Sequence, residues 1–311
     1  MPLHTDHRPL RLDEITGNKE TIVGLKSHLQ KKSPNRSLLF IGPSGCGKTT
    51  LAICVANELE SYDSWNFKML NASDFRGIDT VRDIREQAGR KPLAAAKNRI
   101  WLFDECHKLT ADAQEAILKL LEDPPRDCWF FLATTNPEKL KITLRRRCTE
   151  YQVNPLSDRE ISILLIRISR KEGKRVPNSI IQQISMDSLG SPGIALNVLD
   201  KVIDLAEEEM ARAAKKWAER SSNVITLCRA MLKNKGNNGK GVWEKILCPI
   251  LKEIEEEDPE TIRRQVLEYF RKVLVDGNES AYSIMNWFES PYYDTGRAGL
   301  TLSVYRAFCL D

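Results

Sequence analysis

Four short apolar runs in the first half of the chain are separated by longer segments whose apolar residues recur at helical spacing. Short apolar runs without polar alternation are typical of strands that are buried on both faces. Strands that alternate with helical segments favour a parallel sheet with helices on both sides. The pattern therefore predicts an α/β domain over residues 1–155, with strands at Ser37–Ile41, Phe67–Leu70, Ile100–Phe103 and Trp129–Ala133.

The pattern changes in the second half, where apolar residues recur only at helical spacing. Residues 156–220 are expected to form a small helical domain, and residues 221–311 a second one. In the second of these, Asp258 is suited to cap a helix whose first residue is Pro259 and which Gly277 ends. One face of that helix is apolar and packs in a core or against another subunit, through Ile262, Val266, Tyr269, Phe270 and Val273.

Composition sets broad limits on the class of protein. The chain has 311 residues, of which 41% are hydrophobic and 29% charged, as in globular proteins with two or three domains. It has no bilayer-length apolar run and no signal peptide at its start, so we expect a cytoplasmic protein without a membrane partner. Its eight cysteines form no C-x-x-C pair, which argues against a zinc ribbon and a disulfide framework. The net charge of +4 is too small to indicate nucleic-acid binding by itself.

A glycine-rich segment follows the first predicted strand and precedes a predicted helix. It has the pattern G-x-x-x-x-G-K-[ST], in which glycines let the backbone curl so that its N–H groups point at a phosphate. The N-terminus of the following helix adds partial positive charge. Lys48 supplies a cation and Thr49 a hydroxyl ligand for Mg2+. The segment predicts a nucleoside triphosphate site built from Gly42, Pro43, Ser44, Gly45, Cys46, Gly47, Lys48, Thr49 and Thr50.

Polar residues end two further predicted strands. Asp104 and Glu105 follow Phe103, and Asn136 follows the strand that ends near Ala133. Because ligands of parallel sheets bind at the carboxyl ends of the strands, we expect these residues near the glycine-rich loop. Asp104 would hold Mg2+, Glu105 would polarise the water that attacks the γ-phosphate, and Asn136 would orient that water. The alternative is that the two acids only open an exposed loop, and that the polar strand end has no role.

Two groups of arginines have both a functional and an ordinary interpretation. Arg145, Arg146 and Arg147 form either a solvated basic turn or a site from which one arginine reaches the γ-phosphate bound to a neighbouring subunit. Three more arginines could neutralise successive phosphates of a DNA duplex, although scattered surface arginines are more often only solvated. These three are Arg76, Arg82 and Arg126.

Together these motifs resemble the AAA+ ATPases of the sliding-clamp-loader group, namely the small subunits of replication factor C and their bacterial and phage counterparts. The resemblance covers about Arg8 to Val202. Its most distinctive part is LNASDFRGIDTVRDI at Leu70–Ile84, which is similar to the pattern N-A-S-D-x-R-G-I-D-x-[IV]-R. Three other stretches contribute: HRPLRLDEITGN from His7, DECHKLTADAQEAILKLLEDPP from Asp104, and RRRC from Arg145.

The resemblance implies a AAA+ domain followed by a helical lid at 156–220 and an all-α collar at 221–311. Such a chain would join other clamp-loader subunits in a pentameric ring that uses ATP and Mg2+ to load a sliding clamp onto primer–template DNA. Arg147 would act on the neighbour's nucleotide, while Glu105, Lys48 and Asn136 act in the same chain. The adenine would be bordered by Arg8, Pro9, Ile15 and Thr16, and the DNA backbone would be gripped by Arg76, Arg82 and Arg126.

The sequence departs from the family at one functional position. Gly193 stands where the family has the arginine of G-x-x-R-x-A-L-N, within Gly190–Asn197. This departure motivates a second hypothesis, a structural ring member that binds nucleotide with little turnover. A third is a AAA+ motor of another DNA transaction, which the Leu70–Ile84 segment disfavours. The zinc-binding cysteines of the bacterial subunit are absent, which favours a form similar to replication factor C or to the phage subunits.

Overall fold

The computed structural model describes residues 2–62, 65–72, 78–88, 96–221, 223–234, 240–255, 257–275 and 277–309, without the side chains of 78–80, 82, 215, 219–221, 240 and 309. The chain forms two compact units. One comprises residues 5–157 and the other comprises residues 158–311 together with residues 1–4. The segments predicted as lid and collar therefore lie in one unit, and their division into two domains stays a prediction.

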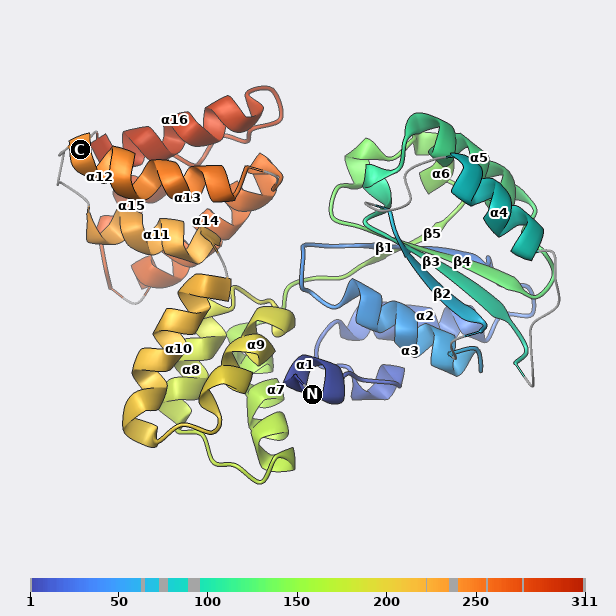
Figure 1. The fold of residues 1–311 in the computed structure, drawn as a ribbon, viewed down its shortest axis with the longest axis horizontal. Coiled ribbons are helices and arrows are strands. Elements are labelled where there is room, and N and C mark those ends of the chain that lie inside the picture. Colours follow the sequence, from blue (N-terminus) through green and yellow to red (C-terminus); the bar gives the residue numbers. More distant parts are fainter. Residues whose placement is uncertain are drawn as a thin grey trace. The chain divides into compact units, whose positions relative to one another are not determined.

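The first unit is built on a five-stranded parallel sheet in the order β2–β3–β4–β1–β5 (Figure 1). The predicted parallel sheet is thus confirmed. The last strand was not anticipated, because Thr149–Gln152 contains a single apolar residue, Tyr151. As an edge strand it pairs only with β1 and buries only that tyrosine. The strands are β1 (Ser37–Ile41), β2 (Phe67–Asn71), β3 (Arg99–Asp104), β4 (Cys128–Thr134) and β5 (Thr149–Gln152).

Helices cover both faces of this sheet, α2 and α3 on one and α4, α5 and α6 on the other (Figure 1). Successive residues of a strand point to opposite faces. Leu38 and Phe40 of β1 accordingly pack in the core with α2 and α3, whereas Leu39 and Ile41 pack in the core with α4, α5 and α6. The unit's helices are α2 (Lys19–Leu29), α3 (Lys48–Glu58), α4 (Ile78–Ala88), α5 (Ala111–Glu122) and α6 (Ile142–Arg145), with 3-10 turns at 12–14, 106–108 and 137–139.

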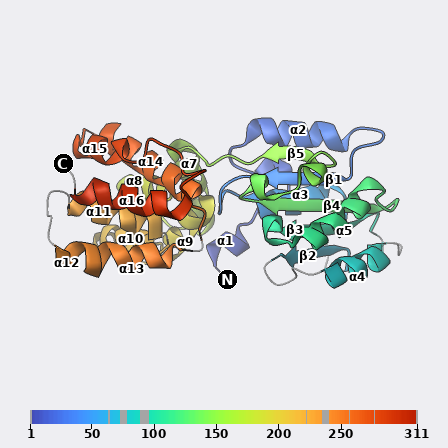
Figure 2. The same ribbon diagram turned by 90° about the horizontal axis from the view of Figure 1, so that it is seen from above.

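The second unit runs through helices α7 to α16 (Figure 2). No helix among the residues described is long and apolar enough to cross a membrane. The short helix α1 (Leu3–Asp6) begins among the residues of this unit. The others are α7 (Asp158–Lys171), α8 (Asn178–Asp187), α9 (Pro192–Val202), α10 (Glu207–Ser221), α11 (Asn223–Lys233), α12 (Lys240–Val242), α13 (Cys248–Glu253), α14 (Pro259–Val275), α15 (Ser280–Asn286) and α16 (Gly296–Cys309), with a π-helical turn at 243–247.

Helix α14 confirms the helix that was predicted from Asp258 onward. The Oδ2 atom of Asp258 accepts the backbone N–H of Thr261 at 2.9 Å, as an N-terminal cap does. The expected apolar face lies in the core of this part of the unit, where Ile262, Val266 and Phe270 are fully buried.

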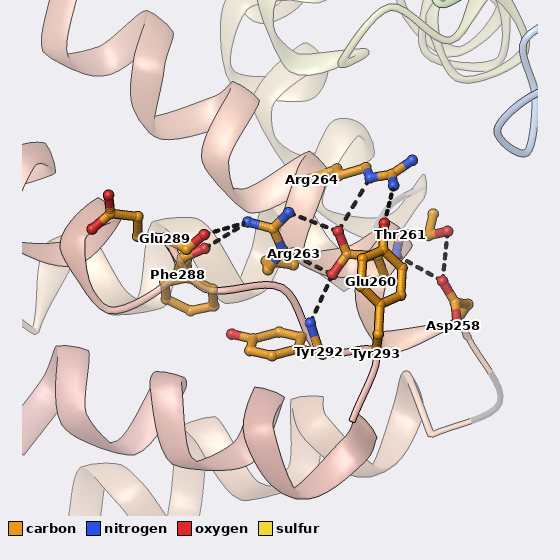
Figure 3. Close-up of polar contacts among 9 residues, drawn as sticks. All are labelled: Asp258, Glu260, Thr261, Arg263, Arg264, Phe288, Glu289, Tyr292 and Tyr293. Carbon is orange, nitrogen blue, oxygen red and sulfur yellow. Dashed lines mark hydrogen bonds and ion pairs between the residues drawn. The ribbon is translucent and has the colours of Figure 1, made fainter. Parts of the chain in front are cut away.

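A buried carboxylate fixes the segment between α15 and α16 onto the first turn of α14 (Figure 3). Glu260 accepts two hydrogen bonds from Arg263, at 2.9 and 2.6 Å, and one from the backbone N–H of Tyr292 at 3.0 Å. Arg263 in turn donates to the carbonyl oxygens of Phe288 and Glu289. Because the charge of Glu260 is hydrogen-bonded on both oxygens, its burial costs little, and its pKa is lowered although burial alone would raise it.

We expect Gly42→Ala to destabilise the first unit. A Cβ atom at Gly42 would lie 2.1 Å from the carbonyl oxygen of Val153, so the backbone would have to move. Gly24→Ala is the matched control, because its Cβ would make an ordinary 3.4 Å contact with Tyr151 inside helix α2. Urea unfolding should show a loss for Gly42→Ala and a gain of about 0.5–1 kcal/mol for Gly24→Ala. Equal stability of the two variants would contradict the close approach.

Candidate functional site

The glycine-rich loop connects the carboxyl end of β1 with the N-terminus of α3. Gly42 is buried against β5, where the N–H of Val153 donates to the carbonyl of Ile41 at 2.7 Å. Gly45 has φ +71° and Gly47 has φ +103°, backbone angles that residues other than glycine rarely adopt. The sequence pattern is therefore required by the backbone, and the loop leads into the positive end of a helix dipole.

Lys48 is held inside this loop. Its side chain is 5% exposed, and its Nζ atom donates to the carbonyl oxygens of Gly42 and Pro43, both at 2.9 Å. An ammonium group has three N–H donors, so one remains for an anion. Ser44 and Gly45 are exposed at the tip of the loop. This arrangement places a fixed positive charge beneath a curled backbone, as a bound triphosphate requires.

Thr49 and Asp104 meet beside the loop. The hydroxyl of Thr49, in the first turn of α3, donates to Oδ2 of Asp104, at the end of β3, at 2.9 Å. A hydroxyl and a carboxylate are the oxygen donors that Mg2+ prefers, and Mg2+ commonly takes one or two protein ligands and completes its shell with water and phosphate oxygens. The donor set therefore fits the magnesium ion that the sequence predicted. Among the residues described, no cluster of three or more His, Cys, Asp or Glu that could hold a metal occurs.

Glu105 lies next to Asp104 in a turned backbone conformation, with φ +51°. Its N–H donates to Oδ1 of Asp104 at 3.0 Å. Its Oε2 atom lies 3.3 Å from the hydroxyl of Thr135 and 3.3 Å from Nδ1 of His107. The carboxylate is therefore oriented by groups from the next strand and from its own loop.

Thr135 and His107 are site residues that the sequence analysis did not single out. The side chain of Asn136, which was predicted to orient water, is buried and accepts the Thr135 hydroxyl at 2.7 Å. Thr135, one residue earlier, is the member of this pair with a contact to Glu105. The signal was present as consecutive polar residues at a strand end. Which of them faces a neighbouring strand depends on the backbone twist, and the role of Asn136 stays a prediction.

Arg147 lies at the amino ends of the strands, whereas the loop lies at their carboxyl ends. Its carbonyl oxygen accepts Nδ2 of Asn35 at 2.9 Å, just before β1 begins, whereas Gly42 follows the end of β1. Five residues of extended strand span about 16 Å, at roughly 3.3 Å per residue, which is longer than one arginine side chain. The guanidinium of Arg147 pairs with Glu122, at the end of α5. Arg147 therefore does not reach the loop of its own chain.

The other two arginines of the run differ from Arg147. Arg145 binds Glu150 through two hydrogen bonds, of 2.9 and 3.1 Å. This carboxylate raises the pKa of the Arg145 guanidinium. Arg146 is exposed. Arg145 and Arg147 are thus both paired with a carboxylate, with side chains 33% and 36% exposed, and Arg146 is the exposed member of the run.

The three arginines predicted to contact DNA are described to different extents in the structure. Arg76 lies outside the described residues, and Arg82 is in α4, although its side chain is not described. Arg126 is exposed in the loop before β4, at the same edge as Arg147. Arg126 therefore lies away from the glycine-rich loop, which follows the carboxyl end of β1.

The residues expected around an adenine lie in the segment that precedes α2. Pro9 lies against α3, because its carbonyl oxygen accepts Sγ of Cys54 at 3.3 Å. Ile15 packs against the core on the α2 and α3 side. Arg8 and Thr16 are half-buried in the same segment. The placement of Pro9 beside the helix that follows the glycine-rich loop is consistent with the predicted pocket, whose base contacts stay a prediction.

Residues 38–156 match the family described as ATPase family associated with various cellular activities (AAA). The chain is 39% identical over 196 residues to the replication factor C small subunit of Methanoculleus marisnigri, a match that covers 62% of this chain and 60% of that protein. It is 38% identical over 196 residues to the replication factor C small subunit of Methanococcus vannielii, which covers 62% of each. The matches thus span about three fifths of these relatives' length.

Solved structures with a similar fold include the RuvB Holliday junction branch migration motor of Thermotoga maritima. The TM-score is 0.58 at 21% sequence identity, covering 73% of this chain and 78% of that one. A mutant of the same protein gives a TM-score of 0.60 at 19% identity, covering 73% and 79%. At this level of identity the likeness concerns the fold alone.

We expect His107 to titrate far below an ordinary histidine. Burial, followed by the charges of Lys139 and Lys108, lowers its pKa from 6.5 to about 4 against the opposing effect of Glu138. The unfolded chain therefore binds a proton between pH 6.5 and 4 that the folded chain does not, so stability falls as pH falls through this range. NMR titration measures the pKa directly. Between pH 7 and pH 4, the free energy of unfolding of wild type should fall relative to that of His107→Asn. A wild-type pKa near 6.5 would contradict the burial.

Proposed function

Because the chain carries a AAA-family domain at residues 38–156, we propose that it hydrolyses ATP as a subunit of a sliding-clamp loader. Other clamp-loader subunits would complete its ring, with ATP bound at each interface. In this proposal the ring opens a sliding clamp, places it on primer–template DNA and releases it after hydrolysis. Support comes from the replication factor C small subunits that share 38–39% of residues with this chain over 196 positions.

One observation carries the proposal: the loop and Arg147 lie at opposite edges of one parallel sheet. The carboxyl edge holds the phosphate loop, the Thr49–Asp104 pair and Glu105. The amino edge holds a surface arginine beside Asn35. A chain with a glycine-rich loop for phosphate at one edge and a partly exposed arginine at the other is suited to a head-to-tail ring, where each arginine would face a neighbour's nucleotide.

The side chains at the carboxyl edge would divide the work of phosphoryl transfer. Lys48 would neutralise charge on the outer phosphates, and Thr49 and Asp104 would hold Mg2+, which when bound offsets further phosphate charge. The carboxylate of Glu105, steadied by Thr135, would polarise the attacking water, and Asn136 would help to orient it. Arg147 of the next subunit would stabilise negative charge that develops in the transition state.

The Glu122 pair is compatible with this role of Arg147. The two side chains are 36% and 45% exposed, and exposed ion pairs of this kind stabilise a protein by about 0–1 kcal/mol. The guanidinium can therefore leave Glu122 for a triphosphate at small cost. Arg146 is the competing candidate, and the two are separated by the variants below.

Contact with DNA would be made through the phosphate backbone. Arg82 in α4, Arg76 in the segment before it and Arg126 are the proposed contacts, as the family resemblance implies. A backbone contact by arginine gives affinity without reading sequence, and it weakens as salt concentration rises.

A structural ring member with little turnover is the second candidate. Gly193 occupies the second position of α9, beside the cap formed by the Ser191 hydroxyl and the N–H of Ile194 at 3.2 Å. Glycine supplies no cation for a nucleotide at this helix. The complete set of Lys48, Thr49, Asp104 and Glu105 favours turnover over this alternative.

Lys48→Ala should abolish nucleotide binding. The buried ammonium is the cation that the loop holds in place, through the carbonyl oxygens of Gly42 and Pro43. Fluorescent ATP binding measured against wild type tests this, with the circular dichroism melting curve as the control for folding. Undiminished binding by a folded Lys48→Ala variant would show that the loop is not the triphosphate site.

Arg147→Ala should lower the rate of ATP hydrolysis in the assembled ring by about 10³-fold, because an arginine supplied by a neighbour contributes 10³–10⁵-fold in other phosphoryl-transfer enzymes. ATP binding by the single chain should stay unchanged. Arg145→Ala is the matched control, since Arg145 already binds Glu150, and Arg146→Ala tests the competing residue. The measurement is steady-state hydrolysis with and without primer–template DNA and clamp. Turnover by a proven monomer that Arg147→Ala leaves unchanged would contradict the shared site.

A further inference from the structure

We propose that His107 is a positioning residue that holds the carboxylate of Glu105 in the orientation needed for hydrolysis. This inference rests on the ATPase function proposed above. His107 lies in the short turn between β3 and α5, and its side chain is 9% exposed. Its Nδ1 atom is 3.3 Å from Oε2 of Glu105 and 3.1 Å from the hydroxyl of Thr134. One ring nitrogen thus lies against the ends of two neighbouring strands.

The contacts define which nitrogen carries the proton. An ionised carboxylate has only acceptor lone pairs, so a nitrogen lone pair facing it would be repelled. Thr134 agrees with this assignment, because its hydroxyl oxygen also accepts the N–H of Asn136 at 3.0 Å and has a second lone pair for the histidine. The network therefore assigns the proton of the neutral imidazole to Nδ1, shared between Glu105 and Thr134.

The geometry explains why a separate donor is useful at this point. Glu105 begins a turn with φ +51°, so the strand ladder does not fix its side chain. Thr135 reaches the same Oε2 atom at 3.3 Å but its hydroxyl also lies 2.7 Å from the Asn136 side chain, and it has a single proton to donate. His107 supplies a second donor from a buried ring. A carboxylate held in one orientation loses less entropy when it engages the attacking water.

A neutral donor also adds no positive charge beside the carboxylate. A cation within about 4–6 Å lowers the pKa of a carboxyl group by 1–3 units, which weakens it as the group that polarises water. Burial, together with the nearby Lys139, Lys108 and Lys48 and against the opposing effect of Glu138, lowers the pKa of His107 to about 4. His107 therefore orients Glu105 at neutral pH without adding positive charge beside it.

Hydrolysis by variants distinguishes positioning from a structural role. His107→Leu replaces the donor with an apolar side chain that fills the same buried position. His107→Asn instead places an amide N–H near the position of Nδ1. We expect kcat to fall about 10-fold or more in His107→Leu, with ATP affinity unchanged, and to be largely restored in His107→Asn. A purely structural role would instead weaken ATP binding and stability together and would show no rescue. If wild type hydrolyses ATP and His107→Leu does so equally fast, the inference is overturned.

The second readout does not depend on turnover. The chain has four histidines, so the ring nitrogens of the full-length protein labelled with 15N can be assigned. We expect His107 to be protonated at Nδ1 in wild type and to lose this preference in Glu105→Ala, while His28, bound to the carbonyl of Asn35, stays unchanged. A proton on Nε2 in wild type would disprove the contact. A wild-type protein that never hydrolyses ATP in any assembly, yet shows the Nδ1 proton, would refute the proposed function and leave the contact standing.

Discussion

The parallel direction of the five strands is the constraint on which the candidate site depends. Carboxyl ends of β1, β3 and β4 share one edge, so the loop after β1, the acids after β3 and the polar residues after β4 converge there. The same constraint sends the segment before β5 to the other edge, where Arg147 lies beside Asn35. The parallel strand direction therefore gathers the loop and the polar strand ends at one edge and places Arg147 at the other.

Short polar contacts then turn this edge into a connected network. Thr49 binds Asp104, and the backbone of Glu105 binds the same aspartate. Glu105 is linked in turn to β4 through Thr135 and, by way of His107, through Thr134. The contacts link the loop after β1 and the ends of β3 and β4 to one another. Preorganised polar groups of this kind are what charge stabilisation in phosphoryl transfer requires.

Part of this site could be read from the chain because local backbone geometry dictates it. Gly45 and Gly47 have positive φ, so a loop of this shape selects glycine wherever it occurs. The three central strands β1, β3 and β4 were visible as apolar runs because they are buried on both faces. Strand β5 was missed because it buries only Tyr151 and shows no apolar run.

The sequence by itself determined the phosphate loop, the acids beside it and the helix that Asp258 caps, because each follows from residues close together in the chain. Only the tertiary structure decided that Thr135 contacts Glu105, that His107 lies between two strand ends, and that Arg145 is already paired with Glu150. The contact of Thr135 with Glu105 spans 30 residues and that of His107 with Thr134 spans 27, whereas Arg145 and Glu150 are five residues apart but lie in different elements. Their partners are chosen by strand order, twist and side-chain direction, which no local pattern of residue types encodes.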